Sequence, residues 1–143
     1  MDPLMAGTGT VLSFGELLLH ICLDADSDWL NKNTRPFYVG GAELNVATAL
    51  ALWGTPSSYF TALPDNSLSV QILNYLKAKN IDTSKVSYSG KRLGLYFLTQ
   101  GKDLKHDALV YDRAGSAFSE LKPRRQSLKY FRLIYWGRSL YPL

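Results

Sequence analysis

Two glycines that lead directly into a polar helix start form the segment of this sequence best suited to bind a small molecule. Gly40 and Gly41 are followed by Glu43 and Asn45, and a run of small apolar residues then continues to Gly54. Because glycine has no Cβ, a ligand can approach the backbone closely, and the first turn of a helix offers N–H groups without helical partners. The segment predicts a small-ligand site at a helix N-terminus. A tight strand-to-helix turn whose glycines serve packing is the alternative.

Composition narrows the class of protein. The chain has 143 residues, 46% of them hydrophobic, and a mean hydropathy of −0.10, which is typical of one globular domain with a real core. No apolar run approaches the ~20 residues of a membrane span, and the N-terminus lacks the pattern of a secretory signal. The single Cys22 cannot form an internal disulfide, which fits a reducing cytoplasm. We therefore expect a cytoplasmic protein that is not bound to a membrane.

The net charge of +4 is unevenly distributed. Basic residues crowd one short region, at Lys122, Arg124, Arg125, Lys129 and Arg132. Such a cluster can bind nucleic acid, but it has no aromatic stacking pattern or recognised motif around it. A solvated face is the favoured interpretation, and the basic surplus would also suit anionic small-molecule substrates.

The apolar pattern changes texture along the chain. Its first part predicts strands alternating with helices, which is typical of parallel β/α units: strands at 11–22, 37–39, 57–62 and 86–89, and helices at 42–53 and 68–79. Its middle predicts strands at 93–99 and 108–112 joined by a polar loop, which indicates an antiparallel hairpin in a small separate sheet.

Four segments carry a resemblance to a known family. They are Phe14-Gly15-Glu16, Val-Gly-Gly-Ala-Glu-Leu-Asn-Val-Ala at 39–47, Leu-Gly-Leu-Tyr-Phe-Leu at 93–98, and Val-Tyr-Asp-Arg-Ala-Gly-Ser-Ala at 110–117. In their order and spacing the sequence resembles the PfkB (ribokinase-like) sugar kinases, and among these most closely the 2-keto-3-deoxygluconate kinases. The glycine segment is common to many PfkB kinases, whereas its combination with the Tyr-Asp-Arg segment is more specific.

The resemblance implies an α/β fold, with an incomplete ribokinase-like three-layer αβα core and a small β-sheet lid that closes over the sugar and often dimerises. Residues 1–10 are expected to be disordered or extraneous, and residues 11–143 to be the N-terminal portion of the kinase domain, with lid strands near 36–40 and 93–113. We therefore expect a homo-oligomer formed through the lid.

The resemblance also implies a set of substrate-binding residues. These are Gly41, Ala42, Glu43, Leu44 and Asn45 along the sugar, Tyr96 from a lid strand, Tyr111, Asp112 and Arg113 at the polar end of the substrate, and Glu16 as a further contact. Arg113 could hold a carboxylate through two parallel charge-assisted bonds, which suits a sugar acid better than a neutral hexose.

Each of these residues has a structural alternative. Tyr96 could be a core tyrosine, and Arg113 could form an ordinary exposed ion pair with Asp112. His20, within the first predicted strand, is interpreted as a core histidine, and no metal-ligand spacing is present.

PfkB kinases carry a catalytic aspartate in a Gly-Ala-Gly-Asp segment late in a chain about twice this length, and no such segment occurs here. The complete enzyme would transfer the γ-phosphoryl group of ATP to a sugar hydroxyl with Mg²⁺ bridging the phosphates. We expect this chain to supply the sugar site and lid of such an enzyme, with no catalytic residue and no ATP-binding segment of its own. The alternative is a non-catalytic module that binds a sugar or dimerises.

Overall fold

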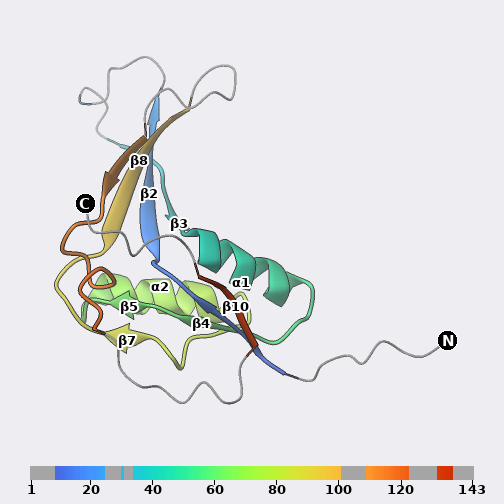
Figure 1. Cartoon of the computed structure of the whole chain (residues 1–143). Coiled ribbons are helices and arrows are strands. Elements are labelled where there is room, and N and C mark those ends of the chain that lie inside the picture. The colour runs from blue at the N-terminus through green and yellow to red at the C-terminus, as the bar shows by residue number, and fades with distance from the viewer. Residues whose placement is uncertain (1–8, 25–29, 31–33, 101–108, 123–131, 137–143) are drawn as a thin grey trace.

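The computed structural model describes residues 9–24, 30, 34–100, 109–122 and 132–136. Figure 1 shows two main β-sheets, of which one packs with the helices and the other extends away from them. We call the first the core sheet and the second the lid sheet.

The core sheet is parallel. It consists of β1 (Val11–Phe14), β4 (Ser57–Phe60), β6 (Ile81–Asp82) and β10 (Arg132–Trp136), in the order β10-β1-β4-β6. The residues of β1 and β4 are almost all buried. Such strands read as continuous apolar or small-residue runs because both faces of a parallel sheet are covered.

The two described helices begin at recognisable signals. Helix α1 (Ala42–Leu52) starts after Gly41, whose φ of 138° suits glycine. Helix α2 (Ser67–Lys77) starts after Asn66, whose side chain accepts a 3.0 Å hydrogen bond from the backbone N–H of Ser69.

Both helices and the core sheet contribute to one hydrophobic cluster. Its buried members are Leu17, Leu44, Ala47, Tyr59, Leu63, Ile72, Leu73, Leu76, Ile81 and Leu93. A small parallel sheet of β5 (Ala62–Leu63) and β7 (Ser87–Tyr88) adds Leu63 to this cluster. A second contact pairs Phe14 with Phe60, at 5.0 Å between ring centroids, and with Phe118, at 5.3 Å.

The lid sheet is mixed. It consists of β2 (Leu18–Asp24), β3 (Phe37–Gly40), β8 (Gly94–Gln100) and β9 (Leu109–Asp112), in the order β3-β2-β8-β9. The central pair, β2 and β8, is parallel, and both edge strands are antiparallel to their neighbours. The predicted hairpin of β8 and β9 is confirmed.

Three details of the predicted elements are wrong. The strand expected at 11–22 is two strands, β1 and β2, which belong to different sheets. The strand expected at 57–62 is interrupted after Phe60, and β6, just after the helix expected at 68–79, was not among the expected strands. In the crossing from β1 to β2, the Tyr59 hydroxyl donates a 3.0 Å hydrogen bond to the Gly15 carbonyl, and the Leu17 N–H donates to Thr61 Oγ1 at 3.4 Å. Gly15 and Glu16 interrupt the apolar run at this crossing, whereas the tertiary contacts that hold the chain there have no local signature.

No helix among the described residues is long and apolar enough to cross a membrane. Of the basic cluster expected to be a solvated face, Arg124, Arg125 and Lys129 lie outside the described residues.

Candidate functional site

A row of aromatic rings crosses all four strands of the lid sheet. Tyr38 of β3 is paired in register with His20 of β2, His20 with Tyr96 of β8, and Tyr96 with Tyr111 of β9. The His20 and Tyr96 rings are stacked, with centroids 4.5 Å apart and planes 9° apart, and each outer tyrosine lies 5.9 Å from its inner neighbour. We call these four residues the aromatic row. Rings that also carry hydroxyl or imidazole groups can contact both the C–H faces and the hydroxyls of a sugar.

The inner members of the aromatic row are half-buried and the outer ones are exposed. Burial raises the pKa of the Tyr96 hydroxyl above its usual value, and the neighbouring Tyr111 and Cys22 add to this rise. Tyr96 therefore stays protonated at neutral pH and keeps its donor. His20, interpreted from the sequence as a core histidine, instead belongs to this face of the lid, with its Nε2 3.5 Å from Cys22 Sγ.

The N-terminus of α1 lies beside this row. A Cβ placed on Gly40 would stand 3.1 Å from the Tyr96 hydroxyl, so the ring tip lies directly over the double glycine. A Cβ on Gly41 would stand 2.6 Å from the carbonyl oxygen of Glu16. Glycine is thus required at Gly41 both by its φ of 138° and by space.

The residues of the first turn of α1 divide into two groups. Ala42 and Asn45 are exposed, whereas Leu44 is buried in the hydrophobic cluster and Glu43 is only 9% exposed. The Glu43 carboxylate lies against Gly15, where any Cβ would overlap it. A negative charge in the first turn is favourable because the helix dipole is positive there. Of these residues, Asn45 presents its amide to solvent, and Leu44 serves packing.

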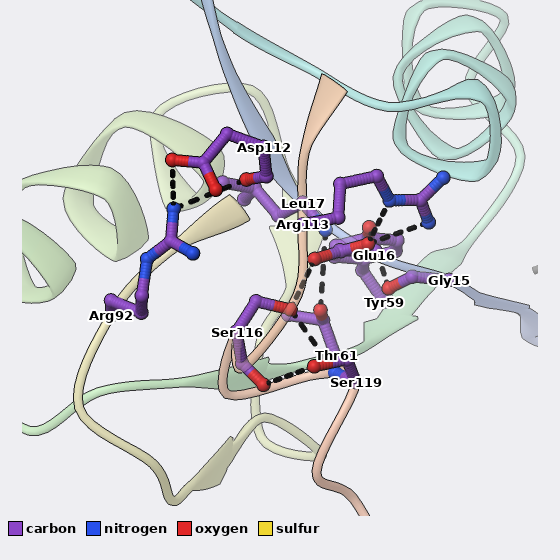
Figure 2. A network of polar contacts seen from close by, with 10 residues as sticks. All are labelled: Gly15, Glu16, Leu17, Tyr59, Thr61, Arg92, Asp112, Arg113, Ser116 and Ser119. Atoms are coloured by element: carbon purple, nitrogen blue, oxygen red, sulfur yellow. Dashed lines mark hydrogen bonds and ion pairs between the residues drawn. The ribbon is translucent and has the colours of Figure 1, made fainter. Parts of the chain in front are cut away.

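Glu16 is at the centre of the polar network in Figure 2. Its side chain is 4% exposed, and it accepts hydrogen bonds from the Ser116 hydroxyl at Oε1 and from Arg113 Nε at Oε2, both at 2.6 Å. Arg113 Nη2 also lies 2.6 Å from the same Oε2. A buried carboxylate is tolerated when an opposite charge and hydrogen bonds satisfy it, and here both are present.

Arg92 and Asp112 brace the segment that carries Arg113. Arg92 Nη1 donates to the Ala114 carbonyl at 2.6 Å, and Arg92 Nη2 reaches the Asp112 carboxylate at 2.5 Å. Both side chains are well exposed, at 35% and 50%. Asp112 therefore pairs with Arg92. The ion pair between Asp112 and Arg113 that the sequence left open is replaced by a pair between Arg113 and Glu16.

The Tyr59 hydroxyl lies within the electrostatic influence of both buried carboxylates, Glu43 and Glu16. Its side chain is fully buried in the core. Burial raises the pKa of its hydroxyl far above the usual value, and the negative charges of Glu43 and Glu16 raise it further, in spite of an opposing contribution from Thr61. Tyr59 is therefore a neutral hydrogen-bond donor that holds the Gly15 carbonyl, and it has no acid–base role near neutral pH.

The predicted site residues thus come together in part. Tyr96, Tyr111 and Arg113 lie on one face of the lid, with the Arg113 guanidinium 5.7 Å from the Tyr111 ring centroid. Sequence reasoning gave no role to His20, Tyr38, Ser116 or Arg92. Tyr38 and His20 lie beside Tyr96 because of the strand register, which the local sequence pattern did not predict. Ser116 belongs to the Val-Tyr-Asp-Arg-Ala-Gly-Ser-Ala segment at 110–117, which could have drawn attention to it.

The arrangement is suited to bind a polyhydroxylated ligand with an anionic end. It offers aromatic faces, hydroxyl and amide groups for ligand hydroxyls, and one guanidinium for a carboxylate. Among the described residues, no group of three or more His, Cys, Asp and Glu side chains could hold a metal ion.

Comparison with curated proteins gives a consistent set of relatives. The chain is 25% identical over 116 residues to 2-dehydro-3-deoxygalactonokinase of Haloferax volcanii, an alignment covering 81% of this chain and 36% of the relative. It is 30% identical over 119 residues to 5-dehydro-2-deoxygluconokinase of Clostridium tetani, covering 78% of this chain and 35% of the relative. The chain therefore spans about a third of the length of these relatives.

Solved structures agree. A PfkB family carbohydrate kinase from Listeria grayi superposes with a TM-score of 0.75 at 32% identity, over 84% of this chain and 38% of that one. The 2-dehydro-3-deoxygluconokinase of Thermotoga maritima gives a TM-score of 0.72 at 34% identity, over 80% of this chain and 35% of that one. These structures confirm the expected fold class, an α/β ribokinase-like core with a β-sheet lid. The family model described as pfkB family carbohydrate kinase matches residues 9–142, and the chain accordingly belongs to the pfkB family of carbohydrate kinases.

Proposed function

We propose that this chain forms the sugar-binding and lid portion of a cytoplasmic, ATP-dependent kinase that phosphorylates a sugar acid, with 2-keto-3-deoxygluconate as the first candidate. The family supports a carbohydrate kinase. Two similar proteins are named for dehydro-deoxy sugar acids, at 30% and 34% identity, and a carboxylate on the ligand matches the guanidinium of Arg113.

The position of Arg113 carries the proposal. Its guanidinium lies beside the aromatic row, and 32% of its side chain is exposed, in contrast to the 4% of Glu16. A ligand that rests on the aromatic row can therefore reach Arg113. A carboxylate on the guanidinium gains charge-assisted hydrogen bonds that a neutral hydroxyl does not.

The remaining residues would orient the sugar hydroxyls. The Asn45 amide has both donors and acceptors and is exposed on the first turn of α1. The Tyr96 hydroxyl lies over Gly40 and remains a donor because its pKa is raised. Gly41 and Ala42 lie at the start of α1, and Ala42 is exposed beside Asn45.

In the complete enzyme, ATP with Mg²⁺ would supply the phosphoryl group and the positive charge that stabilises its transfer. We assign to this chain the binding and orientation of the sugar.

Calorimetric titration of the chain with 2-keto-3-deoxygluconate, gluconate and fructose tests the proposal. We expect the keto acid to bind most tightly, and Arg113→Ala to abolish its binding. Lys91→Ala removes an exposed positive charge adjacent to Arg92 in the sequence and should leave binding unchanged. A folded chain that binds none of these sugars, or binds fructose as well as the keto acid, would contradict the assignment.

A non-catalytic dimerising module is the second candidate, and the reverse face of the lid favours it. Phe37, Ile21, Phe97 and Val110 form another register row, one residue along from the aromatic row. Phe37 is 60% exposed and Val110 is 50% exposed. Two copies could pair through this apolar row, because it offers exposed apolar surface. Light scattering should then give a dimer for the unchanged chain and a monomer for Phe37→Asp, whereas a monomer in both cases would exclude pairing through the lid.

A further inference from the structure

Glu16 lies where the two sheets meet. It belongs to the link between β1 of the core sheet and β2 of the lid sheet, and its partners Arg113 and Ser116 come from the segment after β9, about a hundred residues later. The carboxylate therefore joins the start and the end of the lid to the core. These hydrogen bonds join segments that are distant in the sequence, so they fix the lid relative to the core only once both segments have folded.

The surroundings of the Glu16 side chain are built to receive it. A Cβ on Gly94 would overlap Glu16 Oε1 and would stand 2.6 Å from Leu18 Cδ2. The Ser116 hydroxyl, 1% exposed as a residue, donates to Oε1 and accepts a 3.1 Å hydrogen bond from the Ser119 N–H. Gly94 thus leaves the space that the carboxylate fills, and Ser119 orients the hydroxyl that holds it.

Arg113 depends on this carboxylate for its orientation. Both Nε and Nη2 are directed to the same oxygen, Oε2, so one edge of the guanidinium faces Glu16. An arginine without such a partner samples many rotamers, and ordering it on binding costs free energy. A guanidinium already held in place avoids most of that cost.

We propose that Glu16 is a positioning residue: it makes no contact with the sugar, and it holds Arg113 in the orientation that receives the carboxylate of the substrate. The proposal rests on the proposed function of Arg113 as the carboxylate anchor. It differs from the expectation that Glu16 itself touches the sugar, because the Glu16 side chain is 4% exposed and both of its oxygens already accept hydrogen bonds.

The two roles predict different patterns of binding. A positioning residue acts through Arg113, so its loss matters only for ligands with a carboxylate and only while Arg113 is present. A residue that binds sugar hydroxyls would affect neutral and acidic sugars alike, and its effect would persist without Arg113.

The first experiment measures the dissociation constants of 2-keto-3-deoxygluconate and fructose for the unchanged chain, Glu16→Gln, Arg113→Ala and the double variant. We expect Glu16→Gln to weaken binding of the acid by about tenfold and to leave any fructose binding unchanged. The double variant should equal Arg113→Ala. Ser116→Ala keeps the ion pair and loses one hydrogen bond, so it should weaken binding of the sugar acid by about threefold. The exposed Glu120→Gln should leave the dissociation constants of both sugars unchanged.

The second experiment needs no ligand. The Arg113 Nε–H should exchange with water more slowly than the Arg92 Nε–H in nitrogen-15 spectra, because only the former donates to a buried carboxylate. This protection should be lost in Glu16→Gln and retained in Glu120→Gln. Equal exchange of the two arginines in the unchanged chain would overturn the positioning role whether or not any sugar binds.

The outcomes separate the two proposals. If the folded, unchanged chain binds no sugar acid, the proposed function fails. If the acid binds and Glu16→Gln leaves it as tight or tighter, or if fructose is weakened equally, only the positioning role fails. Should Glu16→Gln not fold, Ser116→Ala and the exchange of the Arg113 Nε–H decide the outcome.

Discussion

The core sheet and the lid sheet have four strands each, yet their side chains are distributed differently. In the core sheet, β1 and β4 are buried on both faces and contain serines, apolar residues and one fully buried tyrosine. In the lid sheet, neighbouring register rows alternate between the aromatic row and the apolar row. The core sheet is therefore closed by packing, whereas in the described part of the lid the outer members of both rows are exposed.

The comparison also explains where the charged groups lie. Glu16 is buried at the crossing between the sheets, and its partner Arg113 is half-exposed on the lid. A charge at this boundary can be satisfied by the protein on one side and presented to a ligand on the other. The junction is therefore the part of the molecule in which the proposed binding role of Arg113 and the stability of the fold depend on the same residues.

The largest effect should follow from truncation in the core. Leu76 of α2 is fully buried in the hydrophobic cluster. Leu76→Ala should lower the free energy of unfolding by about 2–5 kcal/mol, because the lost contacts leave a cavity. Val110→Ala on the lid, half-exposed, should cost no more than about 0.5 kcal/mol. Urea titrations measure both, and comparable losses would show that the lid is as much a part of the core as the helices.

A smaller loss is expected at the junction. Gly94→Ala would place a methyl group on Glu16 Oε1 and displace it from Ser116, which should cost about 1–3 kcal/mol. Gly9→Ala is the matched control, because a Cβ at Gly9 meets nothing within 4 Å. A Gly94→Ala protein as stable as the control would mean that Glu16 is not held where the structure places it.

The elements of the lid show what a sequence can and cannot predict. The hairpin of β8 and β9 follows from two apolar runs joined by a polar loop, and the helix start at Gly41 follows from its glycines. The separation of β1 from β2 was missed because the run at 11–22 was interpreted as one buried strand, although Gly15 and Glu16 interrupt it at the crossing. The hydrogen bond from Tyr59 to the Gly15 carbonyl fixes the chain at this point.

The same limit applies to the site. The resemblance to sugar kinases, together with the guanidinium of Arg113, predicted a sugar acid, but the aromatic row depends on the pairing of strands that lie far apart in the sequence, such as β2 and β8. The pairing of Glu16 with Arg113 joins residues 97 positions apart. Whether a glutamate at such a place contacts the ligand or another side chain is decided by tertiary packing, and the sequence analysis had placed Glu16 among the substrate contacts.

The hydrogen bond of Tyr59 gives a prediction of intermediate size. Tyr59→Phe removes the donor to the Gly15 carbonyl and should lower the free energy of unfolding by about 1 kcal/mol at neutral pH. In the unfolded chain the hydroxyl ionises near its usual pKa of 10.0, whereas burial and the charges of Glu43 and Glu16 raise the pKa in the folded state.

The contribution of Tyr59 is therefore complete below pH 10 and decreases above it, because only the unfolded state then releases the proton. The difference in unfolding free energy between the two proteins should shrink above pH 10 by up to about 1.4 kcal/mol per pH unit. Denaturant titrations at pH 8, 10 and 11 measure it. A difference that is constant over this range would show that the hydroxyl is not buried beside the two carboxylates.

The smallest effect should come from β6, an edge strand of the core sheet, in which Asp82 is exposed. Burial alone would raise the pKa of Asp82 in β6. Its carboxylate accepts hydrogen bonds from the Ser84 N–H at 2.9 Å, the Ser84 hydroxyl at 3.0 Å and the Ser58 hydroxyl at 3.1 Å. These bonds and the charge of Lys85 outweigh burial, so the pKa lies below its usual value. A lowered pKa in the folded state contributes stability above the usual value of 3.8, which is lost as the pH falls below it.

Because Asp82 is exposed, solvent screening should limit the cost of Asp82→Asn at pH 7 to a few tenths of a kcal/mol, about 0.5 at most. The cost should vanish near pH 2, and the exposed Asp65→Asn serves as the control. A loss as large as that of Gly94→Ala would instead place Asp82 among the buried groups of the core, and the contrast between a closed core sheet and an open lid would extend to its edge strand.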